Sequence, residues 1–377
     1  MRVHLIRSMS TRCVLGTLAT GLAVECSSVA HAQVFTGVGV PGGAGSSFGA
    51  GLSADGTTVI GNTDRSEGPG NVAWKWRADS GLSELSTPGF VVTDVSADGQ
   101  TTIGKAPGRQ AIRWTASGTP ELLPIWGDNP TSGDFWVRGP VVSRAGTSAA
   151  GCTSQWADNA AVWTAGSGGH TLFLPPSAPW TGTRTYSPVA ITDDGLNAIG
   201  SYHRAYAYLD GTQVVVVHDW GTYRWNAGGG FSVQLGFGVS DATPSLAVLV
   251  GGSGDSTWRA VGSEDHVLLG MPPISQALSN VTARVSDDGN LVVSCMSVWT
   301  PSHGTQQLEQ FLAQSGCDIS GWSSLVVTDV SGSGQSLCGF GTNPLGITEA
   351  WYATVPAPSW SVLFASASLL ACRRQRH

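Results

Sequence analysis

The chain has 377 residues, of which only 12% are charged, and it contains 51 glycines and 15 tryptophans. Its net charge of −7 argues against a nucleic-acid-binding protein, because such a protein needs a basic face to displace counterions from phosphates. Short apolar runs punctuated by Gly, Asp and Ser indicate strands and tight turns rather than an all-helical fold.

Residues 1–32 have the features of an export signal. Three arginines charge the first part, residues 13–24 are apolar, and Ala30 and Ala32 form a small-x-small motif before Gln33. We therefore expect a signal peptide that is cleaved between Ala32 and Gln33. The alternative is a retained membrane anchor, but the apolar stretch is shorter than the roughly 20 residues that a spanning helix needs.

One phrase then recurs at intervals of 43 to 49 residues. It consists of Ser or Thr, two small or acidic residues, Gly and two apolar residues, and Val92–Gly104 is almost repeated in Val327–Gly339. The copy at Ser240 is degenerate and carries three extra residues. The seven copies begin near Ser53, Ser96, Ser143, Thr192, Ser240, Ser286 and Ser331.

Each unit reads as about four short strands. The glycine in the phrase supplies the positive φ of a hairpin turn, and the paired apolar residues suit a strand buried on both faces. A second glycine at the end of the phrase is interpreted as room for backbones that crowd near a central axis. A tryptophan follows in every unit, and its indole N–H is expected to reach a loop carbonyl. These tryptophans are Trp76, Trp114, Trp163, Trp225, Trp258, Trp299 and Trp351.

Units of this length match the blades of a propeller and are too long for one coil of a β-helix. The sequence therefore predicts an all-β, seven-bladed β-propeller over residues 34–355. Residues 202–223 are inserted in the fourth unit and are predicted to add a hairpin that turns at Leu209–Thr212. Residues 306–314, between the sixth and seventh units, are predicted to form a helix that covers the core.

The two ends of the repeat region complement each other. The seventh unit stops at Trp351–Val355 without a final strand, whereas Val34–Val40 belongs to no complete unit. An open ring would expose two strand edges. We therefore predict that Val34–Val40 pairs antiparallel with Trp351–Val355 and closes the last blade.

Residues 356–377 form a separate tail that combines a proline-containing start, an apolar run over residues 360–372 and a basic end. This pattern predicts a membrane sorting signal that anchors the chain only transiently, because the run is too short to span a bilayer. The residues expected to take part in processing are Ala32, Gln33, Pro356, Ala357, Pro358, Arg373, Arg374 and Arg376.

The repeats SADGTTVIG…AWKW and SADGQTTIG…AIRWT, and the ending from Leu308 to Pro356, resemble exported bacterial HAF-repeat proteins. The tail resembles a PEP-CTERM sorting signal. No unit contains the His-Ala-Phe triplet, and Ala357 stands where the tail motif has Glu. The resemblance implies that the protein is exported, that a membrane transpeptidase-like exosortase processes its tail, and that it is located among extracellular polysaccharides. It implies no assigned activity.

Four cysteines lie in the body of the chain: Cys152, Cys295, Cys317 and Cys338. Of the three ways to pair them, a Cys317–Cys338 disulfide is the favoured candidate. The alternative is that all four are buried thiols, since free Cys packs as a small hydrophobe.

Motifs for metal, nucleophilic or phosphate chemistry are missing from the sequence: it has no His-Glu-x-x-His, Cys-x-x-Cys, strand-borne Gly-x-Ser-x-Gly or P-loop. The Asp-Asp-Gly triplets at 193–195 and 287–289 are interpreted as turns rather than calcium loops. We therefore predict no catalytic residue, no metal and no cofactor. The alternative is a carbohydrate-active hydrolase or lyase whose carboxylates come from several blades around the axis.

Binding has somewhat better support, because aromatic residues outside the repeat positions concentrate in the third and fourth units. Aromatic side chains in loops on a rigid scaffold suit stacking on sugars or peptides. The candidates are Trp126, Trp136, Trp180, Tyr206 and Trp220. The sequence thus predicts an exported, non-catalytic protein of the cell surface or extracellular matrix that binds polysaccharide or protein.

Overall fold

The computed structural model describes the propeller region in segments. These are residues 34–64, 70–85, 88–107, 111–116, 118–123, 140–152, 160–165, 168–172, 182–210, 213–228, 230–235, 238–253, 256–262, 267–271 and 283–356. No helix in these segments is long and apolar enough to cross a membrane.

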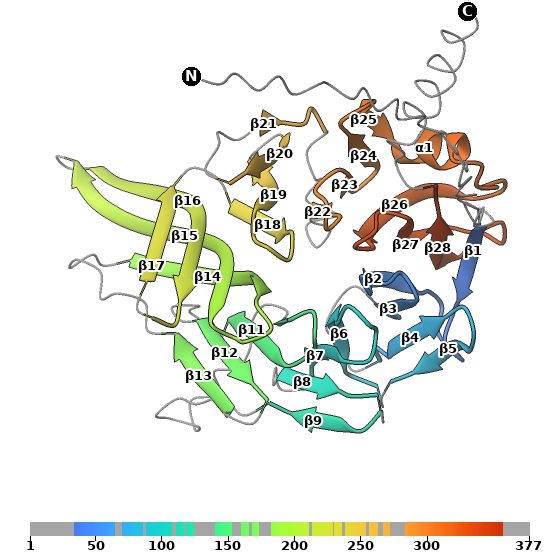
Figure 1. Ribbon diagram of the computed structural model, residues 1–377, viewed down its shortest axis with the longest axis horizontal. Helices are drawn as coiled ribbons and strands as arrows, with labels where there is room; N and C mark the ends of the chain where they lie inside the picture. Colours follow the sequence, from blue (N-terminus) through green and yellow to red (C-terminus); the bar gives the residue numbers. More distant parts are fainter. Residues whose placement is uncertain are drawn as a thin grey trace, which may run out of the picture. The chain divides into compact units, whose positions relative to one another are not determined.

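Seven antiparallel sheets of four strands follow one another around a central axis (Figure 1). We number them blades 1 to 7, and the first strand of each blade lies innermost. Blade 1 comprises β2 (Phe48–Leu52), β3 (Thr58–Asn62), β4 (Ala73–Arg77) and β5 (Gly81–Glu84). Blade 2 comprises β6 (Val91–Val95), β7 (Thr102–Lys105), β8 (Ala111–Trp114) and β9 (Pro120–Leu122). Blade 3 comprises β10 (Val141–Val142), β11 (Ser148–Cys152), β12 (Ala160–Thr164) and β13 (Gly168–Leu172).

The remaining blades repeat this order, with one exception in blade 7. Blade 4 comprises β14 (Gly182–Ile191), β15 (Asn197–Asp210), β16 (Gln213–Asn226) and β17 (Gly230–Leu235). Blade 5 comprises β18 (Gly238–Ala242), β19 (Val248–Ser253), β20 (Ser256–Val261) and β21 (Val267–Leu268). Blade 6 comprises β22 (Arg284–Val285), β23 (Val292–Ser294), β24 (Ser297–Thr300) and β25 (Gly304–Gln307). Blade 7 comprises β26 (Ser323–Val330), β27 (Ser336–Thr342), β28 (Thr348–Thr354) and β1 (Val34–Gly39).

The predicted ring closure is confirmed. Strand β1 is the outer strand of blade 7 and pairs antiparallel with β28, with Val34 opposite Thr354 and Gly37 opposite Trp351. Phe35 of β1 stacks on Trp351, with ring centroids 5.5 Å apart. The segment that precedes the first repeat therefore supplies the strand that the last repeat lacks.

The recurring phrase forms the same hydrogen-bonded turn between the first two strands of each blade. In blade 1, the Ser53 hydroxyl donates to the Asp55 carboxylate and accepts from the Thr58 N–H, while Asp55 accepts from the Thr57 N–H. The turn glycines have φ between 68° and 74°, as a left-handed position requires. Acidic residues in the phrase thus satisfy backbone donors, which agrees with interpreting the Asp-Asp-Gly triplets as turns.

Blade 5 uses this turn three residues later than the phrase at Ser240 suggests. The Thr243 N–H donates to the Val248 carbonyl, and the Thr243 hydroxyl accepts from the Val248 N–H, as Ser53 and Thr58 do in blade 1. Leu246 then occupies the glycine position, with φ at 54°. When the turn is taken to begin at Thr243, the copy no longer has three extra residues. Leu246 adopts a left-handed backbone conformation that is costly for a residue with a side chain.

The second glycine of the phrase lies where backbones crowd, as expected: a Cβ on Gly61 would lie 2.2 Å from the Phe48 carbonyl oxygen, and one on Gly339 would lie 1.9 Å from that of Val326. A Cβ on Gly61 would lie 2.1 Å from the Trp74 ring, and one on Gly339 would lie 2.7 Å from the Trp351 ring. These glycines make room for an aromatic ring on the next strand, not only for backbones near the axis. The expected indole hydrogen bond, by contrast, is wrong for Trp114 and Trp351, whose Nε1 atoms have no partner among the described residues.

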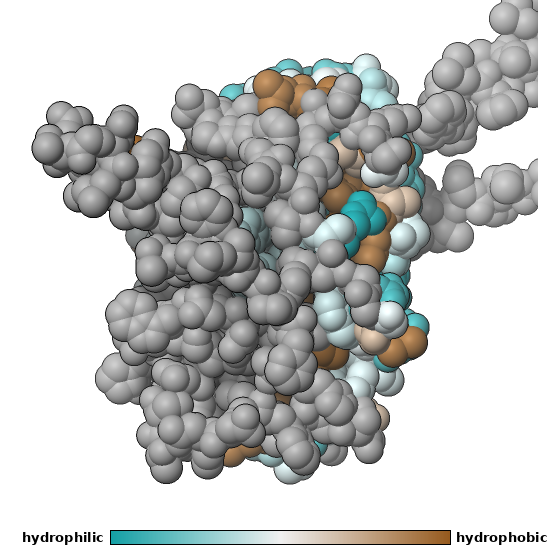
Figure 2. All heavy atoms as spheres, turned by 90° about the vertical axis from the view of Figure 1, so that its left-hand side faces the viewer, coloured by the Kyte–Doolittle hydropathy of each residue, from teal (hydrophilic) through white to brown (hydrophobic). Residues whose placement is uncertain are grey.

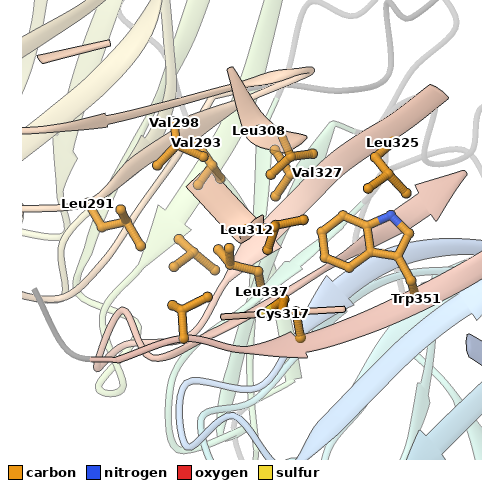
Figure 3. Packing of buried hydrophobic residues seen from close by; sticks show 13 residues of the cluster. Leu291, Val293, Val298, Leu308, Leu312, Cys317, Leu325, Val327, Leu337 and Trp351 are labelled. Carbon is orange, nitrogen blue, oxygen red and sulfur yellow. The ribbon is translucent and has the colours of Figure 1, made fainter. Parts of the chain in front are cut away.

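The predicted helix is confirmed as α1 (Leu308–Gln314), which covers the core between blades 6 and 7. Leu308 and Leu312 are buried in one cluster with Leu325 and Trp351 (Figure 3). The residues before Leu308 belong to strand β25 instead.

The predicted Cys317–Cys338 disulfide is wrong. Both residues are free, buried thiols that lie in different hydrophobic clusters. The Cys317 sulfur lies 3.5 Å from the Thr354 carbonyl, whereas the Cys338 sulfur lies 3.6 Å from the Thr328 hydroxyl. The buried thiols at Cys317 and Cys338 match the alternative prediction. Cys295 is buried as well, in a third cluster with Val326 and Phe340.

The inserted residues of blade 4 form a hairpin as predicted, but they do so by lengthening two existing strands. Strands β15 and β16 pair continuously from Asn197 opposite Asn226 to Asp210 opposite Gln213. They extend beyond the other strands of the blade (Figure 1).

Candidate functional site

The innermost strands bring one residue from each blade to an equivalent position near the axis, two residues before the Ser or Thr that begins the turn. Residues from blades 2, 5, 6 and 7 at this position interact electrostatically, although these blades are not all neighbours. We call this set the axial ring. Its members are Gly51, Asp94, Val141, Ala190, Asp241, Arg284 and Asp329.

Each aspartate of the axial ring holds its own blade to the next. Asp94 accepts from the Val95 N–H through Oδ1 and from the Val142 N–H of blade 3 through Oδ2, both at 2.8 Å. Asp241 accepts from the Val285 N–H of blade 6 at 2.9 Å. Asp329 accepts from the Leu52 N–H of blade 1 at 2.8 Å, across the junction where the ring closes.

A hydroxyl before two of these aspartates adds a second contact to the same neighbouring strand. Thr93 donates to the Pro140 carbonyl at 2.7 Å, and Ser240 donates to the Ala283 carbonyl at 3.0 Å. A Thr-Asp or Ser-Asp pair at a β-bulge therefore engages both a carbonyl and an N–H of the next blade. Sequence reasoning missed this role, although Thr-Asp-Val-Ser at 93–96 and Ser-Asp-Ala-Thr at 240–243 carried the signal.

Arg284 is the cation of the axial ring, and it interacts electrostatically with all three carboxylates. The Arg284 Nε lies 4.0 Å from the Asp329 Oδ1, and its Nη1 donates to the Ser240 carbonyl at 3.5 Å. The side chains of Arg284 and Asp329 keep 24% and 16% of their exposure, so solvent-sized space remains beside them. The ring has two more acids than bases among its members, which makes full ionisation unfavourable.

The pKa values follow from this arrangement. Burial raises the pKa of Asp94 to about 6 and that of Asp241 to about 7, and it also raises the pKa of Asp329. Arg284 and the backbone N–H donors act in the opposite direction. Burial alone would lower the pKa of Arg284, but the three carboxylates raise it.

These shifts predict that the protein becomes less stable as pH rises from 5 to 8. The folded state holds protons on Asp94 and Asp241 that the unfolded chain, with carboxyl pKa values near 3.9, has already released. Stability that depends on bound protons is lost as pH rises through the folded pKa. We expect the free energy of unfolding in urea to fall by about 2 kcal/mol, after a discount for the space beside the ring.

The Asp241→Asn variant provides the comparison for this pH effect. Its amide oxygen still accepts one backbone N–H, but it has no carboxyl to titrate. Its stability should fall less steeply between pH 5 and pH 8 than that of the wild type. Equal slopes in the two proteins would contradict the assignment of the raised pKa to Asp241.

The turns form a second, outer layer at one end of the axis. The second residues of neighbouring turns are linked, since Ala97 N–H donates to the Arg144 carbonyl and Gly332 N–H donates to the Ala54 carbonyl, both at 2.9 Å. The Arg144 guanidinium pairs with the Asp287 carboxylate at 2.5 Å. Because these two residues come from blades 3 and 6, which are not adjacent, their ion pair spans the axis at the turn end.

A cleft of about 560 Å³ lies at the junction of blades 3 and 4. Blade 3 contributes Thr147, Val162, Thr164 and Ala165, and blade 4 contributes Asp193, Asp194, Gly195, Leu196, Trp225 and Ala227. Leu196 is 49% exposed and Trp225 is half-buried. The cleft therefore combines apolar surface, hydroxyls and two exposed carboxylates.

In the coloured part of the face in Figure 2, hydrophobic residues form small patches among hydrophilic ones. Within the described segments, no group of three His, Cys, Asp or Glu residues is arranged to hold a metal ion. The cleft and the axial ring are the candidate sites among the described residues.

The predicted ligand aromatics are not brought together by anything that the structure describes. Trp126, Trp136 and Trp180 lie outside the described residues. Tyr206 and Trp220 lie on the lengthened hairpin, where Tyr206 is opposite Val217 and Trp220 is opposite His203, and only their backbone is described. Trp225, which borders the cleft, was assigned to the repeat and not to a site.

The predicted processing residues lie at or beyond the ends of the described chain. Pro356 is exposed, two residues after the end of β28. The other seven, Ala32, Gln33, Ala357, Pro358, Arg373, Arg374 and Arg376, fall outside the described residues.

The seven four-stranded sheets and their closure define the chain as a seven-bladed β-propeller. No family model matches the sequence, and no curated protein matches it. Among solved structures, the chain is similar to the β-propeller domain of Cps50 (Swd1) from Myceliophteria thermophila, with a TM-score of 0.47 and 12% identity. That similarity covers 85% of this chain and 99% of the other.

Proposed function

We propose that this protein is an exported, non-catalytic propeller of the cell surface or extracellular matrix, of the HAF-repeat kind with a PEP-CTERM-type tail. The observation that carries the proposal is where the ring begins and ends. Strand β1 starts at Val34, directly after the expected cleavage at Ala32, and β28 ends at Thr354, directly before the tail. Removal of both end segments would therefore leave every strand of the propeller in place.

The expected partners follow from this location. The sorting transpeptidase would handle the tail at the membrane, and extracellular polysaccharide or protein would bind the exported ring. The weak overall charge suits such a role, because a chain with 12% charged residues presents no strong field toward nucleic acid.

The use of the axial carboxylates supports a non-catalytic role. Both oxygens of Asp94 accept backbone N–H groups, as do both oxygens of Asp329. A carboxylate that holds two blades together is poorly placed to move during a reaction. Replacing such an aspartate would disturb the packing of the blades as well as any reaction at the axial ring.

A carbohydrate-active hydrolase or lyase is the second candidate function. Asp94 and Asp241 come from separate blades, and burial raises their pKa values to about 6 and about 7. Carboxyl groups that titrate near neutral pH suit general acid–base catalysis. This candidate requires that substrate reach the axial ring.

Fractionation and turnover assays in the native host would test the proposal. We expect the mature protein outside the cytoplasm, with its first residue near Gln33 and its last between residues 355 and 360. It should be retained on extracellular polysaccharide or partner protein without releasing product. Intact mass showing that the secreted form keeps Arg373–His377 would contradict the tail processing, and product formation lost in Asp241→Asn would favour the enzyme.

A further inference from the structure

Long side chains cross three of the blade junctions at one position on the third strand. Lys75 donates through Nζ to the Gly99 carbonyl at 2.7 Å, and Arg259 donates through Nε to the Gly289 carbonyl at 3.0 Å. Tyr352 donates through its hydroxyl to the Gly56 carbonyl at 3.0 Å. The acceptor is the turn glycine of the next blade each time. We call the place of these donors the junction position.

The junction position between blades 3 and 4 carries Val162. The strand register shows that Val162 is equivalent to Lys75. On the third strand of each blade, one residue lies opposite the second glycine of the phrase: Trp74 is opposite Gly61, and Ala161 is opposite Gly151. The junction residue is the next residue along the chain. Valine is too short to cross the junction and has no donor for the Gly195 carbonyl. The cleft lies at this junction, and Val162 and Gly195 both line it.

The cleft walls have the chemistry that a cation requires. The Asp193 Oδ1 accepts from the Ala145 N–H at 2.7 Å, and the Asp194 Oδ1 accepts from the Leu196 N–H at 2.8 Å. The second oxygen of each carboxylate has no partner among the described residues. The hydrogen bond from Thr192 lowers the pKa of Asp194, so this exposed carboxylate is ionised at neutral pH.

Trp225 also lines the cleft and contributes an indole ring to its wall. Elsewhere in the ring, the same kind of contact holds a junction cation: the Arg259 guanidinium lies 5.5 Å from the centroid of the Trp299 ring. An aromatic ring beside a cation stabilises it through the ring's negative face. Blades 3 and 4 therefore supply an acceptor carbonyl, carboxylates and an aromatic ring, but no cation of their own at the junction position.

We propose that the cleft between blades 3 and 4 binds a lysine or arginine side chain from a peptide segment of a partner protein. The ligand's cationic group takes the place that Lys75 and Arg259 occupy at their own junctions and donates to the Gly195 carbonyl. Its aliphatic stem packs on Val162 and Trp225. A volume of about 560 Å³ also holds the residues on either side of this anchor. The inference rests on the proposed function, since it names the partner of the exported ring.

Fluorescence anisotropy with two labelled peptides tests this site. The first peptide alternates Lys and Gly, and the second is identical but has every lysine acetylated. We expect the full-length protein to bind the first peptide and not the second, and salt to weaken the binding. Chitosan oligomers and neutral glucan oligomers, added as competitors, should displace the peptide poorly.

Three variants locate the binding. Val162→Lys places in blade 3 the side chain that blade 1 carries at Lys75, so it should fill the cleft and weaken binding at least tenfold. Asp193→Asn keeps an acceptor for the Ala145 N–H and should weaken binding severalfold. Glu309→Gln changes the charge equally on exposed helix α1 and should leave binding unchanged. Thermal melting shows whether each variant is folded. If Val162→Lys does not fold, the affinity of Asp193→Asn decides whether the peptide binds in the cleft.

Several results would overturn the site. These are equal affinity for the acetylated peptide, unchanged affinity in the folded Val162→Lys or Asp193→Asn variant, or chitosan binding without peptide binding. Such results would leave export and surface location standing, because fractionation measures those separately. Conversely, a cytoplasmic protein that binds the peptide would contradict the proposed function but not the cleft.

Discussion

Replacing Asp329 with alanine is expected to destabilise the protein by about 3 to 5 kcal/mol, as is usual when one partner of a buried ion pair is removed. The change leaves the Leu52 and Val330 N–H groups without their acceptor and takes from Arg284 the carboxylate 4.0 Å from its Nε. It also breaks the contact that joins blade 7 to blade 1 at the axis. Urea unfolding followed by tryptophan fluorescence would measure the loss.

Asp318→Ala is the matched control for this experiment. Asp318 is an exposed aspartate whose hydrogen bond, from the Ser320 N–H, stays within its own loop. We expect its replacement to change stability little. If Asp329→Ala were as stable as this control, the axial aspartates would not hold the blades together.

The turn phrase and the ring closure could be predicted because local chemistry determines them. A glycine with positive φ and an acidic residue two positions after a serine imply the same turn wherever they occur. The closure followed from a missing strand at one end and an extra strand at the other. The turn of blade 5 was harder to place, since Leu246 stands where the other blades have glycine.

The axial ring could not be predicted, because its role depends on the neighbouring blade. Thr93 and Asp94 look like part of a repeated phrase, and nothing near them in sequence identifies Pro140 and Val142 as their partners. Only three of the seven ring positions carry aspartate, so a search for a residue repeated in every blade ignores them. The disulfide prediction failed for a related reason: sequence spacing does not show that Cys317 and Cys338 point into different clusters.

The candidate cleft illustrates how a site can be defined by a difference between repeats. Val162 is an ordinary core residue when its own strand is considered. It becomes informative only beside Lys75, Arg259 and Tyr352, which occupy the same position and cross to the next blade. Blade 6 also has a valine at this position, Val298, so the candidate site depends on the cleft beside Val162 as well as on the missing long side chain.

Deleting residues 34–40 is expected to prevent the mature protein from remaining folded and monomeric. The deletion removes strand β1 and leaves the backbone of β28 unpaired along its outer edge from Ala350 to Thr354. It also removes Phe35, which packs on Trp351 and Trp322 with ring centroids 5.5 and 5.3 Å apart. An exposed strand edge invites pairing with other chains, so the deletion variant should aggregate.

Phe35→Ala separates the contribution of the side chain from that of the strand. This variant keeps the backbone pairing, and we expect it to lose about 2 kcal/mol, because Phe35 is half-buried and a fully buried Phe costs about 3 to 5 kcal/mol. Size-exclusion chromatography and thermal melting would compare it with the deletion. The deletion should be far more severe, because blade 7 is the only place where the two ends of the described chain join. A deletion variant that melts with the wild type as a monomer would show that β1 does not close the ring.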